Sequence, residues 1–189
     1  SQAIIASNTI SNNTTSTYSN SLGGGIYSIG RTIDITGNTI NDNSTGNDGG
    51  GVWVQDSDVS YNAIFDNSIT SGTKKGGGLL IKSTESIINN NNFINNTPFD
   101  IHYSVSQGLA NLDATNNWWS TTDEPTIQSK IYDWFDDASL GIVDYAPYLT
   151  SEGDITSPVP PINLIKTTSD IDNTPTFTWD AVNGAGSYG

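Results

Sequence analysis

The sequence predicts an all-β chain, most of which forms a parallel β-solenoid, a stack of coils built from short strands. Two repeated motifs that share one period support this fold class, and so does the composition. Of the 189 residues, 34% are hydrophobic and 14% are charged, whereas about a quarter of the residues in an average globular domain are charged. The polar surface is therefore expected to consist mostly of uncharged amide and hydroxyl groups.

The first motif is an apolar residue between two asparagines, Asn-x-[Ile/Phe]-x-x-Asn. It occurs at residues 8–13, 38–43, 62–67 and 91–96, at intervals of 30, 24 and 29 residues. The second motif is Gly-Gly-Gly followed by an apolar run, at intervals of 26 and 27 residues from position 23 onward. Because the two motifs interleave at one period of about 25 residues, the chain is predicted to be a repeat protein.

Each repeat contains short apolar runs separated by Gly, Asn, Ser and Asp, which indicates strands and corners. The glycine content excludes a helical repeat. Parallel coils stack about 4.8 Å apart, so equivalent apolar side chains should form inward rows. One predicted row contains Ile10, Ile40, Ile64 and Phe93, and a second contains Ile26, Val52, Leu79 and Ile101.

The repeated glycines and asparagines have architectural explanations that need no ligand. A corner requires glycine where φ is positive or where two backbones approach closely, and the glycines in question are Gly24, Gly50 and Gly77. Asparagine tolerates a left-handed backbone, and stacked side-chain amides can hydrogen-bond to one another. The asparagines predicted to do so are Asn13, Asn43, Asn67 and Asn96.

These motifs resemble those of the pectate-lyase-like right-handed parallel β-helix superfamily, particularly its polymorphic outer-membrane-protein and prokaryotic surface-protein branches. The resemblance covers residues 1–149 and implies a right-handed solenoid. Residues 116–149 are similar to the segment that ends such surface β-helices, although Ser120 stands where these proteins usually have Gly. This segment is therefore expected to cap the solenoid.

The cap should contain a short helix that covers the apolar side chains and strand edges of the last coil. Asp123 is suited to the N-cap and Pro125 to the first turn. Apolar residues then recur at helical spacing from Ile127 through Ile131 to Phe135. The aromatic residues predicted to form the core of the cap are Trp118, Trp119, Trp134 and Phe135.

Two further segments are expected after the solenoid. Residues 150–161 have the composition of a semi-rigid proline-rich linker. Residues 162–189 are similar to the first strands of a fibronectin-III-like or immunoglobulin-like sandwich, a fold that needs about 100 residues, so this domain is expected to be incomplete. The chain begins in mid-pattern without the features of a signal peptide, which suggests an artificial or processing boundary.

The charge balance limits the classes of partner. With 20 acidic and 6 basic residues the net charge is −14, so nucleic acid and anionic membranes would be repelled. No apolar run reaches the roughly 18 residues of a membrane span, and no membrane insertion of this segment is expected. Cysteine is absent, so stability must come from packing and hydrogen bonds. We expect an extracellular or cell-surface location.

The resemblance extends to polysaccharide lyases and hydrolases, so catalysis has to be tested residue by residue. Lyases of this class use a basic residue beside a calcium-binding group of acids. Arg31 and Lys82 each follow a glycine-led strand, but no cluster of acids accompanies both. His102 is the only histidine, and no Ser, Cys or second His motif surrounds it. No catalytic constellation is recognisable, and the chain is expected to be non-catalytic.

Calcium is the metal considered, and no other cofactor is expected. Asp42 and Asp66 occupy equivalent repeat positions and should stack at one coil spacing. Their counterparts are Asn12 and Asn95, so a polar row in which Asn and Asp exchange freely explains them as well, and Ca²⁺ needs six or more oxygens. The candidate ligand-binding residues are the aromatic Trp53, Tyr27 and Tyr103, and alternation points Trp53 outward if Val52 and Val54 face inward.

The sequence also contains four matches to the glycosylation acceptor pattern Asn-x-[Ser/Thr], beginning at Asn12, Asn13, Asn43 and Asn95. Several such matches are expected by chance in a chain rich in Asn, Ser and Thr.

Three functions remain open from the sequence. The first is a structural or adhesive module of a multidomain surface protein, with extracellular glycans or other surface proteins as partners. The second is a β-helix that binds or cleaves polysaccharide. The third is a subunit of an extracellular assembly, because solenoids and incomplete sandwiches can join end to end or donate strands.

Overall fold

The computed structural model describes residues 3–15, 22–71 and 75–156, together with two short strands near the C-terminus. The chain divides into two compact units, Ser1–Thr156 and Ser157–Gly189. The first unit contains the solenoid and extends past the expected end of that domain at residue 149.

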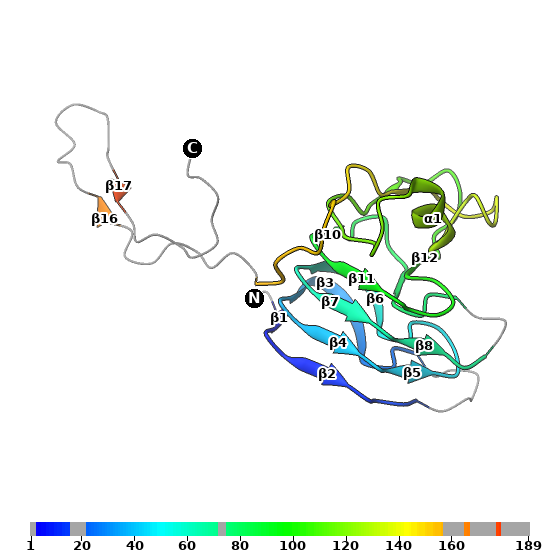
Figure 1. Ribbon diagram of the computed structural model, residues 1–189, viewed down its shortest axis with the longest axis horizontal. Coiled ribbons are helices and arrows are strands. Elements are labelled where there is room, and N and C mark those ends of the chain that lie inside the picture. The colour runs from blue at the N-terminus through cyan, green and yellow to red at the C-terminus, as the bar shows by residue number, and fades with distance from the viewer. Residues whose placement is uncertain (1–2, 16–21, 72–74, 157–164, 167–176, 179–189) are drawn as a thin grey trace. The chain divides into compact units, whose positions relative to one another are not determined.

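The first unit is a right-handed parallel β-helix of about five turns, as predicted (Figure 1). Its largest sheet, which we call sheet A, runs through one strand of each successive coil, and every pairing in it is parallel. The strands of sheet A, in order, are β1 (Ala3–Ala6), β3 (Ile26–Thr36), β6 (Val52–Ser60), β9 (Leu79–Ile81), β12 (Ile101–Tyr103) and β14 (Ile131–Tyr132), with β10 (Ile88–Asn89) paired to the end of β6.

The other sides of the coils carry shorter parallel sheets. The second sheet stacks β2 (Thr9–Ser11), β4 (Thr39–Asn41), β7 (Ala63–Phe65) and β11 (Asn92–Ile94). Two further pairs are β5 (Ser44–Thr45) with β8 (Ser68–Ile69), and β13 (Leu112–Asp113) with β15 (Val143–Asp144).

The core contains the two inward rows that the repeats predict, along with other buried side chains of the coils. Ile10, Ile40, Ile64 and Phe93 pair in register across the second sheet. The buried Trp119 continues this row, because its ring stacks on Phe93 with 5.0 Å between centroids. In sheet A the row from Ile26 to Ile101 is in register and continues to Ile131. One coil could not bury these side chains alone, so the stack of coils is the unit of stability.

Side-chain amides form two continuous hydrogen-bonded ladders along the solenoid, one at each end of the second sheet. In the Asn13 ladder (Asn13, Asn43, Asn67 and Asn96) each Nδ2 donates to the Oδ1 of the next rung over 2.9–3.0 Å. In the Asn8 ladder (Asn8, Asn38, Asn62, Asn91 and Asn117) the same bond measures 3.0–3.1 Å. The rungs from Asn38 onward are buried, and these bonds satisfy their polar groups.

The first and second glycines of each Gly-Gly-Gly triplet are required for different reasons. The first glycine of each triplet has a positive φ, for example +75° at Gly49. The second lies against the neighbouring coil, since a Cβ on Gly50 would stand 2.3 Å from the carbonyl oxygen of Gly77. Gly24 and Gly77 have equally close carbonyl neighbours, at 2.1 Å. A side chain at the second position would therefore push two coils apart.

The capping helix is shorter than its apolar spacing suggested. The helix α1 (Glu124–Ser129) begins at the N-cap Asp123, whose carboxylate accepts a hydrogen bond from the Thr126 amide at 3.0 Å, and Ile127 is buried beneath it. The helix then ends, because Ile131 pairs with Ile101 in sheet A and the chain becomes strand β14. The prediction of one helical face running to Phe135 is therefore wrong.

The aromatic residues of the cap have different surroundings. Trp119 is in the core, Trp118 and Trp134 are half-buried, and Phe135 is 64% exposed, contrary to its expected place in the cap core. Because α1 stops before Phe135, a turn points its ring away from the core, where it meets Trp134 edge-on at 5.2 Å.

The residues after the cap also belong to the first unit. The Leu149 amide donates to the Asn117 carbonyl at 2.9 Å, and Asn92 exchanges two hydrogen bonds of 2.8 Å with the backbone of Gly153. The proposed linker, residues 150–161, is thus hydrogen-bonded to β11 over its first part.

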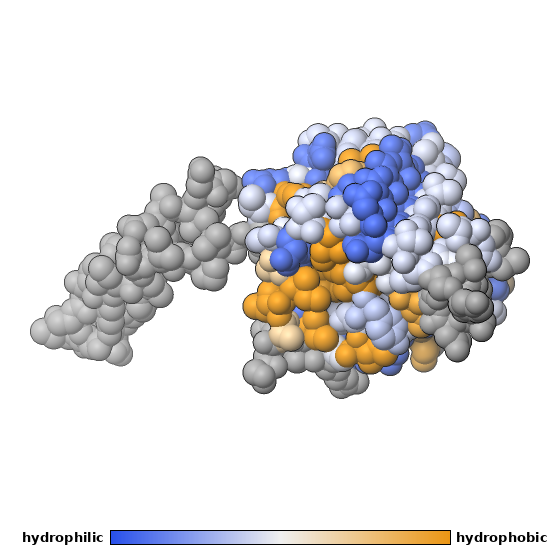
Figure 2. All heavy atoms as spheres, turned by 90° about the horizontal axis from the view of Figure 1, so that it is seen from below, coloured by the Kyte–Doolittle hydropathy of each residue, from blue (hydrophilic) through white to orange (hydrophobic). Residues whose placement is uncertain are grey.

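The first coil carries an apolar surface. Ile5, Ile10 and Ile33 are only partly buried against the core, and Ile4 is 61% exposed. Figure 2, seen from the side of β1 and β2, shows hydrophobic residues gathered on this face.

In the second unit the described residues form one antiparallel pair, β16 (Ile165–Lys166) with β17 (Phe177–Thr178). The other residues of the predicted sandwich segment 162–189 lie outside the described residues, so the sandwich stays a prediction.

Candidate functional site

The outer face of sheet A carries a row of mostly aromatic residues, one from each coil. Alternation along the strands turns these side chains away from the core while their neighbours face inward. The pairing of the strands places them in register. The row, called here the outer aromatic row, consists of Tyr27, Trp53, Leu80, His102 and Tyr132.

One end of the outer aromatic row contains two of the predicted ligand-binding residues. Tyr27 stacks on Trp53, with 4.7 Å between ring centroids and 31° between planes. Tyr27 is 50% exposed, but Trp53 is only 6% exposed. Trp53 therefore projects outward as predicted, yet it is covered, because Tyr27 stacks on its ring and the backbone corner at Gly49 lies against its Cβ. Tyr27 is the residue of this pair that a ligand can reach.

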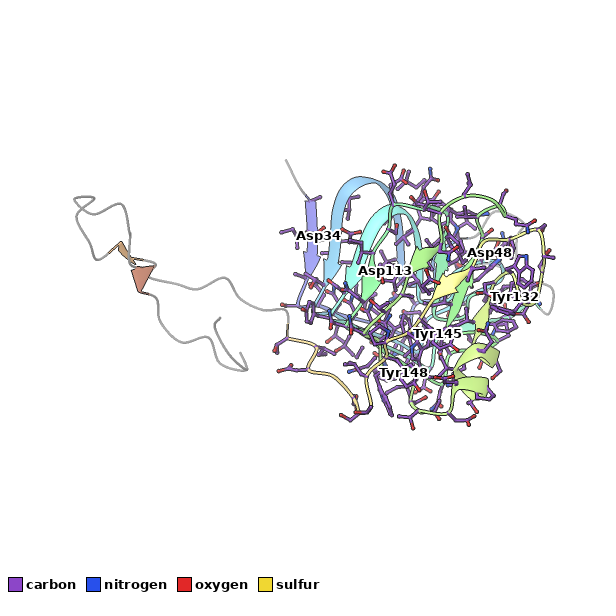
Figure 3. All side chains as sticks on the ribbon, turned by 90° about the horizontal axis from the view of Figure 1, so that it is seen from above. Asp34, Asp48, Asp113, Tyr132, Tyr145 and Tyr148 are labelled. Atoms are coloured by element: carbon purple, nitrogen blue, oxygen red, sulfur yellow. The ribbon has the colours of Figure 1, made fainter. Side chains whose placement is uncertain are left out.

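The other end of the row is an aromatic cluster held by a lysine. Tyr132, labelled in Figure 3, meets His102 edge-on at 5.2 Å and Phe99 at 5.1 Å. The Lys75 ammonium lies 4.6 Å from the centre of the Tyr132 ring and 5.4 Å from that of Phe99, which are cation–π distances. Burial, followed by the charges of Asp137 and Asp136, raises the pKa of the Tyr132 hydroxyl. This arrangement joins Lys75, which precedes β9, to Tyr132 of β14.

Tyr103, the third predicted ligand-binding residue, is not on the surface. Its neighbour His102 occupies the outward position, so alternation turns Tyr103 inward, in register with Ile81. The ring is fully buried, its hydroxyl donates to the Ala110 carbonyl at 2.8 Å, and burial raises its pKa. Tyr103 is a core residue and cannot stack on a sugar at the surface.

The predicted metal pair lies on an exposed corner of the solenoid. Asp42 and Asp66 both have a φ of 54°, and Asn12 and Asn95 have the same left-handed backbone at the equivalent positions. Asn and Asp are the non-glycine residues that best tolerate this conformation, which explains why they exchange here. Among the described residues no group of three or more His, Cys, Asp or Glu side chains could hold a metal ion, and calcium binding stays a prediction.

A second row of carboxylates, which the sequence reasoning missed, lies on the outer face of the solenoid. Asp34 pairs in register with Asp58, and Asp113 with Asp144, while Ile87 separates the two pairs. Asp34 and Asp113 are labelled in Figure 3. Local hydrogen bonds occupy several of these groups: Asp58 accepts from the Ile87 amide at 2.8 Å, and both oxygens of Asp144 accept from the Asn111 amide. Aligning the repeats at the strand after each corner would have revealed this row.

Asp113 and Asp144 also line a surface hollow of about 650 Å³ near the end of the solenoid. Aromatic rings of Phe135 and Tyr145 contribute to its walls. Burial is the main cause of a raised pKa at the Tyr145 hydroxyl, with the negative charge of Glu124 adding to it.

The basic residues do not form a lyase centre among the described side chains. The Lys82 ammonium is exposed and donates to the Ser104 hydroxyl at 2.8 Å, and the side chain of Arg31 lies outside the described residues. Lys130 pairs with the buried carboxylate of Asp100 at 3.5 Å. Asp100 in turn accepts the last amide of the Asn13 ladder, from Asn96 Nδ2 at 2.8 Å. This ion pair therefore ends a ladder.

The fold and this surface define a right-handed parallel β-helix with an amide-lined interior corner and an outer aromatic row. The family model described as "Periplasmic copper-binding protein (NosD)" matches residues 1–133, and the chain belongs to this family. The family is periplasmic, which is a cell-envelope location. Searches of curated proteins and of solved structures found no match. Among the described residues no helix has the length and apolar character of a membrane span.

The residues of this chain do not fit a copper site. Copper in proteins is held mainly by imidazole nitrogens and by the sulfurs of Cys and Met, and Cu²⁺ also takes oxygen ligands, but no group of three or more His, Cys, Asp or Glu among the described residues could hold a metal ion. The sequence has one His, no Cys and no Met, and the one imidazole, His102, lies half-buried against Tyr132. The copper of the family description is therefore not assigned to any residue here.

Proposed function

We propose that this chain is a non-catalytic structural and adhesive module of a cell-envelope protein. The observation that carries this proposal is that the buried polar side chains bind one coil to the next. The buried amides of both ladders are hydrogen-bonded from coil to coil, and the Asn13 ladder ends on the Asp100–Lys130 ion pair. These groups hold coils together, as expected of a stiff rod, and they leave the outer face for contacts.

The experiment that tests this function is a glycan-array and polysaccharide-cleavage screen on the folded 189-residue chain, with and without calcium. We expect no cleavage under either condition. Binding to a glycan without cleavage supports the adhesive part of the proposal, and silence in both screens supports a scaffold. Calcium-dependent cleavage would contradict it and would direct attention to Arg31, Lys82, Asp42 and Asp66.

Polysaccharide binding is the second candidate function, and the exposed ring of Tyr27 favours it. A flat aromatic ring that is already held by stacking loses little conformational entropy when a sugar ring packs on it. If a glycan binds here, Tyr27→Ala should abolish binding and leave the fold intact. Phe135→Ala is the control, because Phe135 is also an exposed aromatic residue (64%, against 50% for Tyr27) far along the chain, and its loss should leave binding unchanged.

Binding to other surface proteins and self-assembly stay predictions. The apolar surface of the first coil, which includes the exposed Ile4, is the described region most suited to such contacts.

A further inference from the structure

We propose that Asn12 and Asn95 are acceptor sites for N-linked glycans, and that the fold closes the other two acceptor motifs, at Asn13 and Asn43. The sequence pattern alone makes all four equivalent. The ladders make them different, because a glycan attaches to the same amide nitrogen that a ladder rung uses as its donor.

The chemistry of the modification sets the requirement. Transfer from a lipid-diphosphate-linked oligosaccharide forms a bond between C1 of the first sugar and Nδ2 of the asparagine. The bond between C1 and the diphosphate oxygen breaks, the lipid diphosphate leaves, and Nδ2 loses one of its two protons. An acceptor therefore needs an amide that can give up one N–H and a hydroxyl residue two positions later that the transferring enzyme can reach.

Asn43 fails both requirements. Its side chain is fully buried, and Nδ2 uses both hydrogens, one to the Ile10 carbonyl at 2.8 Å and one to Asn67 Oδ1 at 3.0 Å. The hydroxyl residue of its motif, Thr45, is also fully buried and accepts a hydrogen bond from Thr15 at 2.7 Å. A glycan here would break a ladder in the middle of the solenoid.

Asn13, at the first rung, is exposed, but it fails because both hydrogens of its Nδ2 are used. Nδ2 donates to the Ser11 carbonyl at 3.2 Å and to Asn43 Oδ1 at 2.9 Å. The hydroxyl of its motif belongs to Thr15, which is engaged with Thr45. Attachment at Asn13 would therefore cost hydrogen bonds at both ends of the motif.

Asn12 and Asn95 satisfy both requirements. Both side chains are exposed, and neither side-chain Nδ2 donates a hydrogen bond to a described residue. Both residues have a left-handed backbone, with φ of 58° and 54°, so they form the exposed corner next to the ladder. The hydroxyl residues of their motifs, Thr14 and Thr97, are exposed as well. The Thr14 hydroxyl lies 3.1 Å from that of Ser44, so it is exposure, and not freedom from hydrogen bonds, that separates Thr14 from the half-buried Thr15. The two sites stand at equivalent positions of the first and fourth repeats, with Asp42 and Asp66 between them.

The family's cell-envelope location agrees with this modification, since surface loops of exported proteins are where such motifs are used. Occupancy should be higher at Asn12, because Pro98 follows the Asn95 motif and stiffens the backbone that the enzyme must bind.

The test uses the folded full chain, a purified oligosaccharyltransferase, its lipid-diphosphate-linked donor and a control acceptor peptide, with glycopeptide mass spectrometry as the readout. Each hydrogen bond that must be lost lowers by about fivefold the fraction of molecules in which the asparagine can react. Because Asn43 Nδ2 makes two such bonds, glycan occupancy at Asn43 should be at least about twentyfold below that at Asn12. No attachment to the folded chain while the control peptide is modified would overturn the proposal. Attachment at Asn43 of the folded chain would overturn it too.

Two neighbouring substitutions separate Asn12 from Asn13. Thr14→Val removes the Asn12 motif and keeps Asn13-x-Thr15, whereas Thr15→Val removes the Asn13 motif and keeps Asn12-x-Thr14. We expect the first variant to lose the glycan on the peptide that contains residues 12 and 13 and the second to keep it there, and the reverse result refutes the assignment. A synthetic peptide of residues 39–48, which has no solenoid around it, should accept a glycan at Asn43. If it does not, the fold is not what closes that site.

Discussion

The middle rung of the Asn13 ladder allows the sharpest test of the architecture. Asn67 donates to the Ile40 carbonyl at 2.8 Å and to Asn96 Oδ1 at 3.0 Å, and its own Oδ1 accepts from the backbone and side-chain amides of Asn43 at 3.1 and 3.0 Å. The substitution Asn67→Ala removes all four bonds. It leaves the Ile40 carbonyl and two N–H groups of Asn43 buried without these partners.

A buried polar group that loses its partner costs about 1–3 kcal/mol, so three such groups should lower the free energy of unfolding by about 3–9 kcal/mol. A domain has about 5–15 kcal/mol in total, so the variant should be close to unfolded. The assay is urea denaturation followed by circular dichroism on the full chain.

The matched control is Asn13→Ala, which removes the first rung of the same ladder. Asn13 is exposed, and Asn43 Oδ1 still accepts a hydrogen bond from the backbone N–H of residue 13 at 3.1 Å, so the expected loss is about 1 kcal/mol or less. If the two variants have the same denaturation midpoint, the ladder does not hold the coils together, and this reasoning is refuted.

Three further tests, two of them with a control variant, concern other parts of the fold. Gly50→Ala should lower the melting temperature severely, because its Cβ would lie 2.3 Å from a backbone oxygen of the next coil. The control is Gly108→Ala, which has open space around it and should cost about 1 kcal/mol for its φ of +85° alone. Trp119→Ala should lower the free energy of unfolding by about 3–5 kcal/mol in urea denaturation. Phe135→Ala, at an exposed site, should change it little. Equal losses of stability in the two variants would contradict the description of the cap. Burial raises the pKa of the Asp100 carboxyl above its ordinary value of 3.8, and the partner lysine only partly opposes this. A raised folded-state pKa gives stability that is present below 3.8 and is lost as the pH rises through the folded pKa. Asp100→Asn should therefore gain stability relative to the wild type as the pH rises above 3.8. Denaturation curves at several pH values measure the difference in the free energy of unfolding between the two proteins. A difference that does not change with pH would contradict the burial of an ionised carboxylate.

The repeat pattern carried most of the information about the ladders. The intervals of 30, 24 and 29 residues between the asparagine motifs are the separations of the hydrogen-bonded pairs Asn13–Asn43, Asn43–Asn67 and Asn67–Asn96. Equivalent residues of a solenoid must lie one above another, so the sequence period gives the separation along the chain of the residues that are in contact. For this reason the inward rows could also be predicted.

The site was predicted less completely. Alternation correctly turned Trp53 outward, but its exposure depends on Tyr27 of the neighbouring coil and on the corner at Gly49, which the strand pattern does not contain. Tyr103 was misplaced, although aligning residues 101–103 with 52–54 and 79–81 would have put it inward with Val54 and Ile81.

The sequence by itself determined the stacked coils, their inward rows and the asparagines that join them, because these depend on periodicity and on the backbone conformations that Gly and Asn tolerate. Only the tertiary structure decided how the stack ends. The apolar spacing from Ile127 to Phe135 suits a helix, but the free edge of β12 takes Ile131 as a strand instead, since unpaired backbone groups at the end of a sheet outweigh local helix preference. The same holds for Asp100, which ends the Asn13 ladder only because Lys130 is brought beside it by the next coil.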